Sequence, residues 1–390
     1  MSPISRRAAF SPQNLRVGML STYPPKLCGL ATFAAALGDE LTRAGHQVDV
    51  VRIDDGDDAS PATFRPVVAT LVNGVPASIR NTAAVLSRCD VAIIQHEYGI
   101  FGGDDGDEVL QLLTALEVPA IVVLHTVPLA PTPNQRRILG VISDLAARVV
   151  VMTETASARL LASYPVDHAC VVTIPHGASL PSAARSVAPK GRPPQLLTWG
   201  LLGPGKGIEH AIDALALLDD LDRRPRYTVA GVTHPKVLAR DGHEYRHSLM
   251  QRSRAIGVAD SVSFDDTYRN LQELTRFVAS ASAVVLPYDS LDQVTSGVLV
   301  DAIAAGRPVI ATAFPHAVEL LSSGAGIVVP HADPHALADA IRSIVTDPDL
   351  LASMADEARR LAPSLSWSTI AGHYAALAEE LSGSVERVAI

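Results

Sequence analysis

Short apolar runs alternate with longer amphipathic stretches along most of this chain. The runs are about five residues long, which is typical of strands buried on both faces of a parallel sheet. In the first half, an apolar run leads into a glycine- and proline-containing loop, and the helical pattern that follows ends at Gly45. This pattern predicts a helix at residues 31–44 and strands at residues 15–20, 47–53, 91–95, 121–125, 148–152 and 171–175.

The alternation stops once and then restarts. Residues 179–194 hold four prolines and scattered charges without periodicity, which indicates a linker. We therefore expect an α/β fold in which two doubly wound Rossmann-like domains, residues 15–178 and 195–365, face a central cleft. A helix at residues 366–385, with an apolar stripe from 367 to 381, is expected to cross back to the N-terminal domain. Strands in the second half are predicted at residues 195–199, 227–230, 262–265, 283–287, 309–312 and 326–329.

Composition narrows the possible functions. The 390 residues are 48% hydrophobic and 19% charged, which is enough apolar material for two packed cores. The net charge is −9 without a basic block, so nucleic acid is not expected as a partner. Cys28, Cys89 and Cys170 are odd in number and far apart, which fits a reducing compartment. No apolar run has the length of a signal peptide core or of a membrane span, so a soluble cytoplasmic protein is expected, with peripheral membrane contact left open.

Two loops that follow predicted strands are candidates for phosphate binding. The loop at residues 21–33 contains Gly29 before a helix, where backbone amides favour an anion; an ordinary tight turn explains this glycine equally well. The loop at residues 200–207 nearly matches the phosphate-loop pattern GxxxxGK[ST], but Gly207 stands where the magnesium-binding hydroxyl belongs. Lys206 is thus expected to neutralise a leaving diphosphate without metal, the alternative being a solvated surface lysine.

A third candidate segment spans residues 287–309. A polar loop follows a strand, and a helix is predicted to begin near Ser296–Gly297, where free amides and the positive end of the helix dipole suit a phosphate. Asp301 lies inside this helix and can accept hydrogen bonds from a ribose diol. Gly306 and Pro308 end the helix before the next strand.

These loops, together with the sequence AlaAlaGlyArgProVal at 304–309, resemble the retaining GT-B glycosyltransferases of family 4. The resemblance spans roughly residues 15–380. In that family the helix carries two glutamates, the first contacting the donor sugar and the second the ribose; the matching positions here hold Gln293 and Asp301. Lys206 matches the family's lysine, whereas Leu201 replaces its usual arginine, so one diphosphate cation is missing. His125 matches a histidine that commonly lies near the transferred sugar.

The resemblance therefore implies a site with catalytic and donor-binding residues. The catalytic residues implied are His125, Lys206 and Gln293. The donor-binding residues implied are Gly29, Gly203, Lys206, Gln293, Ser296, Gly297, Val298 and Asp301. Contacts to the nucleobase are expected near residues 232–235 and 267–268.

Other polar segments lie at strand ends of the same cleft. His96, Glu97 and Tyr98 are assigned to the acceptor side. A metal site built from His96, Glu97, Asp104 and Asp105 is the competing interpretation, although these residues lack a defined ligand spacing. His316 and Glu319 follow another strand, where they either touch the donor or cap the next helix.

The predicted function is metal-independent transfer of a hexose, with mannose as one candidate, from a nucleotide-diphosphate sugar to a carbohydrate or other hydroxyl acceptor, with retention of configuration and without a cofactor. Three alternatives are weighed against it. A nucleoside triphosphatase using residues 200–207 lacks the metal-anchoring hydroxyl. A non-catalytic nucleotide-sugar-binding protein would fit the changes at Leu201 and Gln293. An epimerase would need a pair of acidic groups that the sequence does not show.

Overall fold

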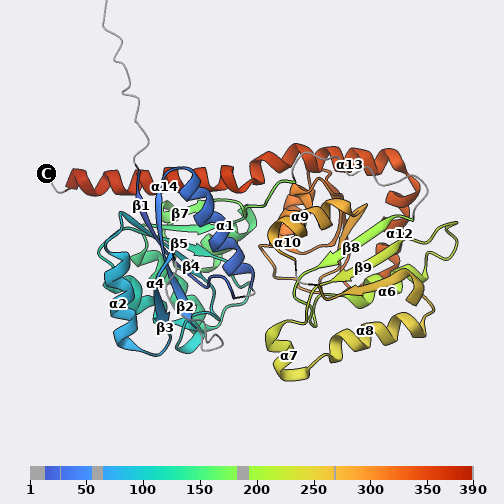
Figure 1. Cartoon of the computed structure of the whole chain (residues 1–390), viewed down its shortest axis with the longest axis horizontal. Coiled ribbons are helices and arrows are strands. Elements are labelled where there is room, and N and C mark those ends of the chain that lie inside the picture. Colours follow the sequence, from blue (N-terminus) through green and yellow to red (C-terminus); the bar gives the residue numbers. More distant parts are fainter. Residues whose placement is uncertain (1–13, 27, 55–64, 182–192, 268, 389–390) are drawn as a thin grey trace, which may run out of the picture.

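The computed structural model describes residues 14–26, 28–54, 65–181, 193–267 and 269–388, with side chains up to residue 383. It consists of two α/β units, each built on one parallel sheet, with helices on both faces (Figure 1). The strand order is β3-β2-β1-β4-β5-β6-β7 in the first sheet and β10-β9-β8-β11-β12-β13 in the second. Both orders are those of a doubly wound fold, so the predicted fold class is confirmed.

The N-terminal unit is packed on both faces of its sheet. One face contacts α2–α5, and the other contacts α1 and the C-terminal helix, and each face has its own apolar cluster. The strands are β1 (Arg16–Ser21), β2 (Gln47–Asp54), β3 (Val67–Val72), β4 (Val91–His96), β5 (Ala120–Leu124), β6 (Arg148–Val151) and β7 (Val171–Thr173). The helices are α1 (Gly29–Arg43), α2 (Pro76–Leu86), α3 (Glu108–Ala115), α4 (Pro133–Leu145) and α5 (Glu154–Ser163).

The C-terminal unit repeats this plan with six strands and a second pair of apolar clusters. The strands are β8 (Gln195–Trp199), β9 (Arg226–Ala230), β10 (Val262–Asp265), β11 (Ala283–Leu286), β12 (Val309–Thr312) and β13 (Gly326–Val329). The helices are α6 (Ile208–Ala216), α7 (Pro235–Asp241), α8 (Glu244–Ala255), α9 (Leu271–Ser280), α10 (Gly297–Ala304), α11 (Pro315–Leu321), α12 (Pro334–Thr346) and α13 (Pro348–Leu361).

The last helix, α14 (Trp367–Val388), leaves the C-terminal unit and lies against α1 of the N-terminal unit (Figure 1). Ile370 and Tyr374 are fully buried there, in the same cluster as Phe33. The crossing is fixed where the chain leaves the first unit, because the backbone N–H of Ala178 donates to Leu365 O (2.7 Å). Most of the predicted linker, residues 182–192, lies outside the described residues.

The predicted strands are all present, with ends shifted by at most two residues, but β3 was missed. β3 is an edge strand, and most of its side chains are only partly buried, although its sequence, VVATLV, is interrupted by a single threonine. Among the described helices, none is long and apolar enough to cross a membrane.

The strand orders also determine where the candidate ligand-binding loops lie. In each sheet the order reverses beside the first strand, between β1 and β4 and between β8 and β11. Loops that leave the carboxyl ends of two such neighbouring strands run to opposite faces of the sheet and leave a crevice between them, which is where doubly wound folds bind ligands. Four of the candidate segments follow these four strands: residues 21–33, 96–98, 200–207 and 287–309.

Candidate active site

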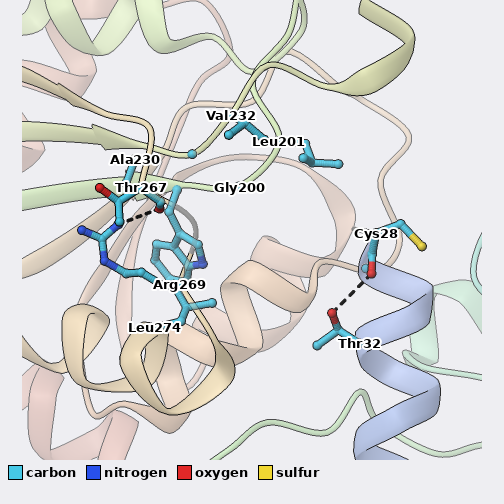
Figure 2. Close-up of a pocket in the computed structure, with 12 residues that line it drawn as sticks. Cys28, Thr32, Gly200, Leu201, Ala230, Val232, Thr267, Arg269 and Leu274 are labelled. Carbon is cyan, nitrogen blue, oxygen red and sulfur yellow. Dashed lines mark hydrogen bonds between the residues drawn. The ribbon is translucent and has the colours of Figure 1, made fainter. Parts of the chain in front are cut away.

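A cavity of about 180 Å³ lies between the two units, at the carboxyl ends of strands of the second sheet and the amino end of α1 (Figure 2). The N-terminal unit contributes the first turn of α1, with Cys28, Gly29 and Thr32. The C-terminal unit contributes the loops after β8, β9 and β10 together with α9. Those residues are Trp199, Gly200, Leu201, Ala230, Gly231, Val232, Thr267, Arg269 and Leu274. A ligand in this cavity would contact both units.

Gly29 opens α1 on the wall of this cavity. The helix is capped by Cys28, whose Sγ accepts from Ala31 N (3.4 Å) and whose carbonyl accepts from Thr32 N and Thr32 Oγ1. The amides of Gly29 and Leu30 have no partner within the helix, as the first turn of any helix requires. The first turn of a 15-residue helix thus presents backbone N–H groups near the cavity, as expected for an anion site.

The loop after β8 is held tightly against the loop after β9. Leu202 N donates to Val232 O (2.9 Å), and a Cβ on Gly231 would lie 2.0 Å from Gly200 O. Gly231 also has a φ of +124°, a conformation that L side chains rarely adopt. Gly203, a predicted donor contact, is buried in this loop beside Val237 of α7.

Gly207 explains why this loop cannot be a magnesium-dependent phosphate loop. Its φ is +60°, and a Cβ at this position would lie 1.8 Å from the carbonyl oxygen of Pro287. A serine or threonine is therefore sterically excluded where a phosphate loop needs its metal-binding hydroxyl. The nucleoside triphosphatase alternative loses its basis in this chain.

Lys206 is a partly buried cation without an acidic partner among the described residues. Its Nζ lies 4.4 Å from the ring centroid of Tyr288, which follows β11. Burial lowers the pKa of this ammonium. A desolvated cation that contacts a ring face instead of a carboxylate can bind an incoming anion without first breaking an ion pair.

The N-terminus of α10 lies beside the same loop. Ser296 caps the helix: its Oγ accepts from Leu299 N (3.3 Å) and its carbonyl accepts from Val300 N (3.2 Å). The amides of Gly297 and Val298 therefore have no partner within the helix. Val298 lies 3.8 Å from the position that a Cβ on Gly200 would take. The structure thus brings the predicted residues Ser296, Gly297 and Val298 next to the glycine loop.

Asp301 is one turn further along α10, on the same helix face as Gly297 and Val298. It is partly buried, and its carboxylate has no hydrogen-bond donor among the residues that the structure describes. Burial raises the pKa of Asp301 to about 7. A carboxylate in this state would gain from hydroxyl donors, such as those of a ribose diol.

Gln293 precedes α10 in the polar loop of residues 287–296, called here the Gln293 loop. Its Nε2 donates to Thr295 O (3.0 Å). Its backbone carbonyl accepts from His316 N (3.3 Å), and His316 Nδ1 accepts from Ser296 N (2.8 Å). Burial lowers the pKa of His316 to about 4, which keeps this ring neutral and able to accept. His316 therefore supports the loop from α11.

Glu319 caps a helix, but not the one that follows it in sequence. It lies in α11, and its carboxylate accepts from the backbone N–H groups of Glu154 (2.9 Å) and Thr155 (2.8 Å) at the start of α5. α5 belongs to the N-terminal unit, so this contact joins the two units.

His125 follows β5, with its ring against Phe33 (centroids 5.0 Å apart). Its Nε2 lies 2.7 Å from Gln95 Oε1, so Nε2 carries the proton and Nδ1 is left as an acceptor. Burial lowers the pKa of His125 to about 3, helped by the nearby His176 and His96. The ring is therefore neutral at pH 7 and offers hydrogen-bonding groups rather than a charge.

The three acceptor-side residues differ in their exposure. His96 has no exposed surface, and burial lowers its pKa to about 4, so it lies behind the cleft wall and packs on Tyr98 (ring centroids 5.1 Å apart). Glu97 and Tyr98 are partly exposed. Burial raises the pKa of Glu97, whose carboxylate accepts from Thr126 Oγ1 and from Tyr98 N (3.0 Å).

The alternative metal site does not assemble in the structure. Asp105 accepts hydrogen bonds from Thr132 and Asn134, away from His96 and Glu97. In the part of the chain that the structure describes, three metal-capable side chains come within 4.8 Å of one another at Glu209, His210 and Asp289. In that group, Glu209 is held by Tyr245 Oη (2.9 Å) and His210 by Asp289 (3.2 Å).

Sequence reasoning missed part of the cavity wall. Val232 and Thr267 lie within the segments expected to contact a base, whereas Tyr268 is outside the described residues. Arg269 and Leu274 were not foreseen. The guanidinium of Arg269 pairs with Asp265 and lies 3.9 Å from the ring centroid of Phe277. The sequence could have indicated these residues only through their position, because they follow the carboxyl end of β10.

Comparison with known proteins gives the same architecture and a family. HepE of Anabaena, solved in complex with UDP, superposes with a TM-score of 0.72 at 16% identity, over 94% of this chain and 100% of that one. Sucrose-phosphate synthase of Thermosynechococcus elongatus gives 0.73 at 20% identity, over 95% and 99%. The fold is therefore GT-B.

Three relatives in sequence carry the name D-inositol 3-phosphate glycosyltransferase. The protein of Streptomyces coelicolor is 31% identical over 44% of this chain and 37% of its own length. That of Corynebacterium jeikeium is 29% identical over 64% and 61%. The match to that of Jonesia denitrificans is 27% identical over 87% and 86%. The first two alignments thus span less than two thirds of those relatives.

Two family models cover consecutive parts of the chain. The model described as Glycosyltransferase Family 4 matches residues 28–180, and that described as Glycosyl transferases group 1 matches residues 182–361. Their boundary falls between the two structural units. The chain belongs to the group 1 GT-B glycosyltransferases of family 4.

Proposed function

We propose that this protein transfers a hexose from a nucleotide-diphosphate sugar to a hydroxyl acceptor, with retention of configuration and without a metal ion. The observation that carries the proposal is one constellation in the C-terminal unit. Three kinds of group lie around the crevice between β8 and β11, each without a hydrogen-bonding or charged partner among the residues that the structure describes: a cation (Lys206), two backbone amides (Gly297 and Val298) and a carboxylate (Asp301). A diphosphate flanked by a ribose has the complementary groups.

The donor would lie across the inter-domain cavity. Its base would fit between the loops after β9 and β10, and Asp301 would accept from the ribose hydroxyls. Lys206 and the α10 amides would bind the diphosphate. The sugar would then point toward Gln293 and toward His125 of the other unit.

In the reaction, the bond between the anomeric carbon and the diphosphate oxygen breaks, and the diphosphate leaves with the electron pair. The acceptor oxygen forms the new bond from the same face, and its proton passes to the departing phosphate oxygen. Lys206 and the amides stabilise the charge that develops on the leaving group. His125 is neutral and serves to position the sugar, because its pKa of about 3 makes it a poor proton donor or acceptor at pH 7.

The acceptor is proposed to bind on the N-terminal side, near Glu97 and Tyr98. The names of the sequence relatives make a phosphorylated inositol one acceptor to test, alongside simple sugars. The fold neighbour solved with UDP-glucose makes UDP-glucose a donor to test, alongside GDP-mannose. A cytoplasmic location is part of the proposal and is supported by three free cysteines.

Turnover tests the proposal directly. Release of nucleoside diphosphate from UDP-, GDP- and ADP-sugars should be seen with one donor class, should persist in EDTA, and should fall with Lys206→Met. Arg252→Ala, which removes a surface ion pair to Asp213 inside the C-terminal unit, is the control and should leave turnover unchanged. Tight donor binding without turnover for any acceptor would instead indicate a non-catalytic nucleotide-sugar-binding protein.

A further inference from the structure

The Gln293 loop belongs to the C-terminal unit but is packed into the N-terminal unit. The side chain of Val294 is 3% exposed and lies in the apolar cluster built by β1, β4, β5 and their helices. The carboxylate of Asp292 accepts from Leu129 N (3.0 and 3.1 Å), which follows β5. One hydrophobic and one polar contact thus anchor the loop across the domain boundary.

Arg159 of α5 makes the most extensive of these contacts. Its side chain is 8% exposed, and its Nη1 donates to Val127 O (2.9 Å), to Asp292 O (3.0 Å) and to the Asp292 carboxylate. A buried guanidinium with these acceptors has little freedom to move, and it fixes the loop to the carboxyl end of β5.

The carbonyls on either side of Gln293 are both bound by the N-terminal unit. Asp292 O accepts from Arg159, and Val294 O accepts from Thr153 Oγ1 (3.0 Å). The carbonyl of Gln293 itself accepts from His316 N (3.3 Å) in α11. Three successive carbonyls are therefore held, so the backbone of Gln293 is fixed, and its side chain is held by a hydrogen bond within the loop, to Thr295 O (3.0 Å).

α11 is tied to the N-terminal unit in turn. Glu319 accepts from Glu154 N, Thr155 N and Thr155 Oγ1 (2.9, 2.8 and 2.6 Å) at the amino end of α5. A carboxylate is favoured there by the helix dipole and by amides that lack partners within the helix. The same helix, α5, thus holds the Gln293 loop through Arg159 and its supporting helix α11 through its amino end.

We propose that Arg159 and Glu319 are positioning residues that set the Gln293 side chain against the donor sugar when the two units are closed. The inference rests on the proposed function for the role of Gln293, and it adds that the N-terminal unit controls that role. Donor chemistry would then depend on α5, which contributes no residue to the donor cavity.

The test separates sugar positioning from nucleotide binding. Arg159→Ala should lower kcat by about 2- to 10-fold, the loss expected when one neutral hydrogen bond to the sugar is misplaced, whereas affinity for the nucleoside diphosphate alone should stay within about twofold. Arg159→Lys should recover part of kcat, because it keeps the charge and one donor direction. Arg252→Ala is the matched control, an Arg–Asp pair within one unit.

A double-mutant cycle shows whether Arg159 acts through Gln293. If it does, Arg159→Ala should cost little further activity in a Gln293→Ala background. Losses that multiply in the double variant, or a kcat for Arg159→Ala equal to wild type, would overturn the proposal. Should Arg159→Ala fail to fold, Asp292→Asn and Glu319→Gln give the same comparison with smaller changes in packing.

Binding data keep this proposal distinct from the proposed function. The extra affinity of the nucleotide sugar over the bare diphosphate, measured by calorimetry, should shrink in Arg159→Ala even if no acceptor has been found. Absence of wild-type turnover with every donor and acceptor would count against the transferase assignment alone. An unchanged sugar-dependent affinity would count against the positioning role alone.

Discussion

Asp301→Asn should stabilise the unliganded protein while weakening donor binding. The carboxylate is partly buried without a hydrogen-bond donor among the described residues, and its pKa is raised to about 7. In the unfolded chain the same group titrates near 3.8. At a pH between these two pKa values, the unfolded chain has released the proton of Asp301 and the folded protein still keeps it. The free energy of unfolding therefore falls as the pH rises through this range, and it becomes constant above the folded pKa.

The size of the effect follows from the two pKa values. A difference of about three units corresponds to a ceiling of about 4 kcal/mol, and partial exposure of the group should reduce this to about half. Asparagine has the same shape and no charge to desolvate. The stability of Asp301→Asn relative to wild type should therefore grow from pH 5 to pH 7 and stay constant above pH 8.

Urea denaturation at pH 5, 7 and 8 measures this difference. Calorimetry at pH 8 should show the opposite effect on function, a loss of about 10- to 100-fold in affinity for the nucleoside diphosphate, because hydrogen bonds to a charged acceptor contribute about 1.5–3 kcal/mol. A 2′,3′-dideoxy nucleotide is the control and should bind both proteins equally. A variant that is no more stable at pH 8 than wild type, or that loses affinity equally for both nucleotides, would refute the reasoning.

Three further predictions concern the diphosphate site and the histidine. Lys206→Met should lower affinity for the nucleoside diphosphate by about 10- to 100-fold in calorimetry, since it removes a charged donor, with Arg252→Ala unchanged. Gly207→Ser should lower the free energy of unfolding by more than about 2 kcal/mol in urea, because its Cβ would meet Pro287 O, and it should create no magnesium-dependent triphosphate hydrolysis. His125→Gln should leave the shape of the pH profile of kcat unchanged between pH 6 and 8. The reason is that His125, with a pKa of about 3, does not titrate in this range.

The sequence predicted the features that depend on local pattern. The glycine loop with Lys206 and the helix start at Ser296–Gly297 were placed correctly, because glycine with positive φ and a serine cap are readable within a few residues. The strand ends that flank the cleft followed from short apolar runs. Whether these residues act as the resemblance implies stays a prediction for the experiments above.

The contacts between the units were beyond such reasoning. Arg159 and Asp292 are 133 residues apart, and Thr155 and Glu319 are 164 apart. Each is an ordinary polar residue in its own helix or loop, and they meet only once both sheets are folded and placed against each other. The same holds for Arg269, whose position on the cavity wall depends on the turn after β10.

The neutral residue at position 293 gives these inter-domain contacts their significance. A neutral amide forms a hydrogen bond worth about 0.5–1.5 kcal/mol, whereas a carboxylate would contribute about 1.5–3 kcal/mol, so Gln293 in its proposed role would bind a sugar hydroxyl less strongly than the glutamate usual in the family. A weaker hydrogen bond contributes to donor binding only if little of its free energy is offset by the entropy lost in ordering the loop. Because Arg159, Thr153 and His316 already hold the surrounding carbonyls, that ordering cost is met when the units close and not when the sugar binds. In the proposed mechanism, preorganisation by the N-terminal unit would thus be the means by which this chain uses glutamine at position 293.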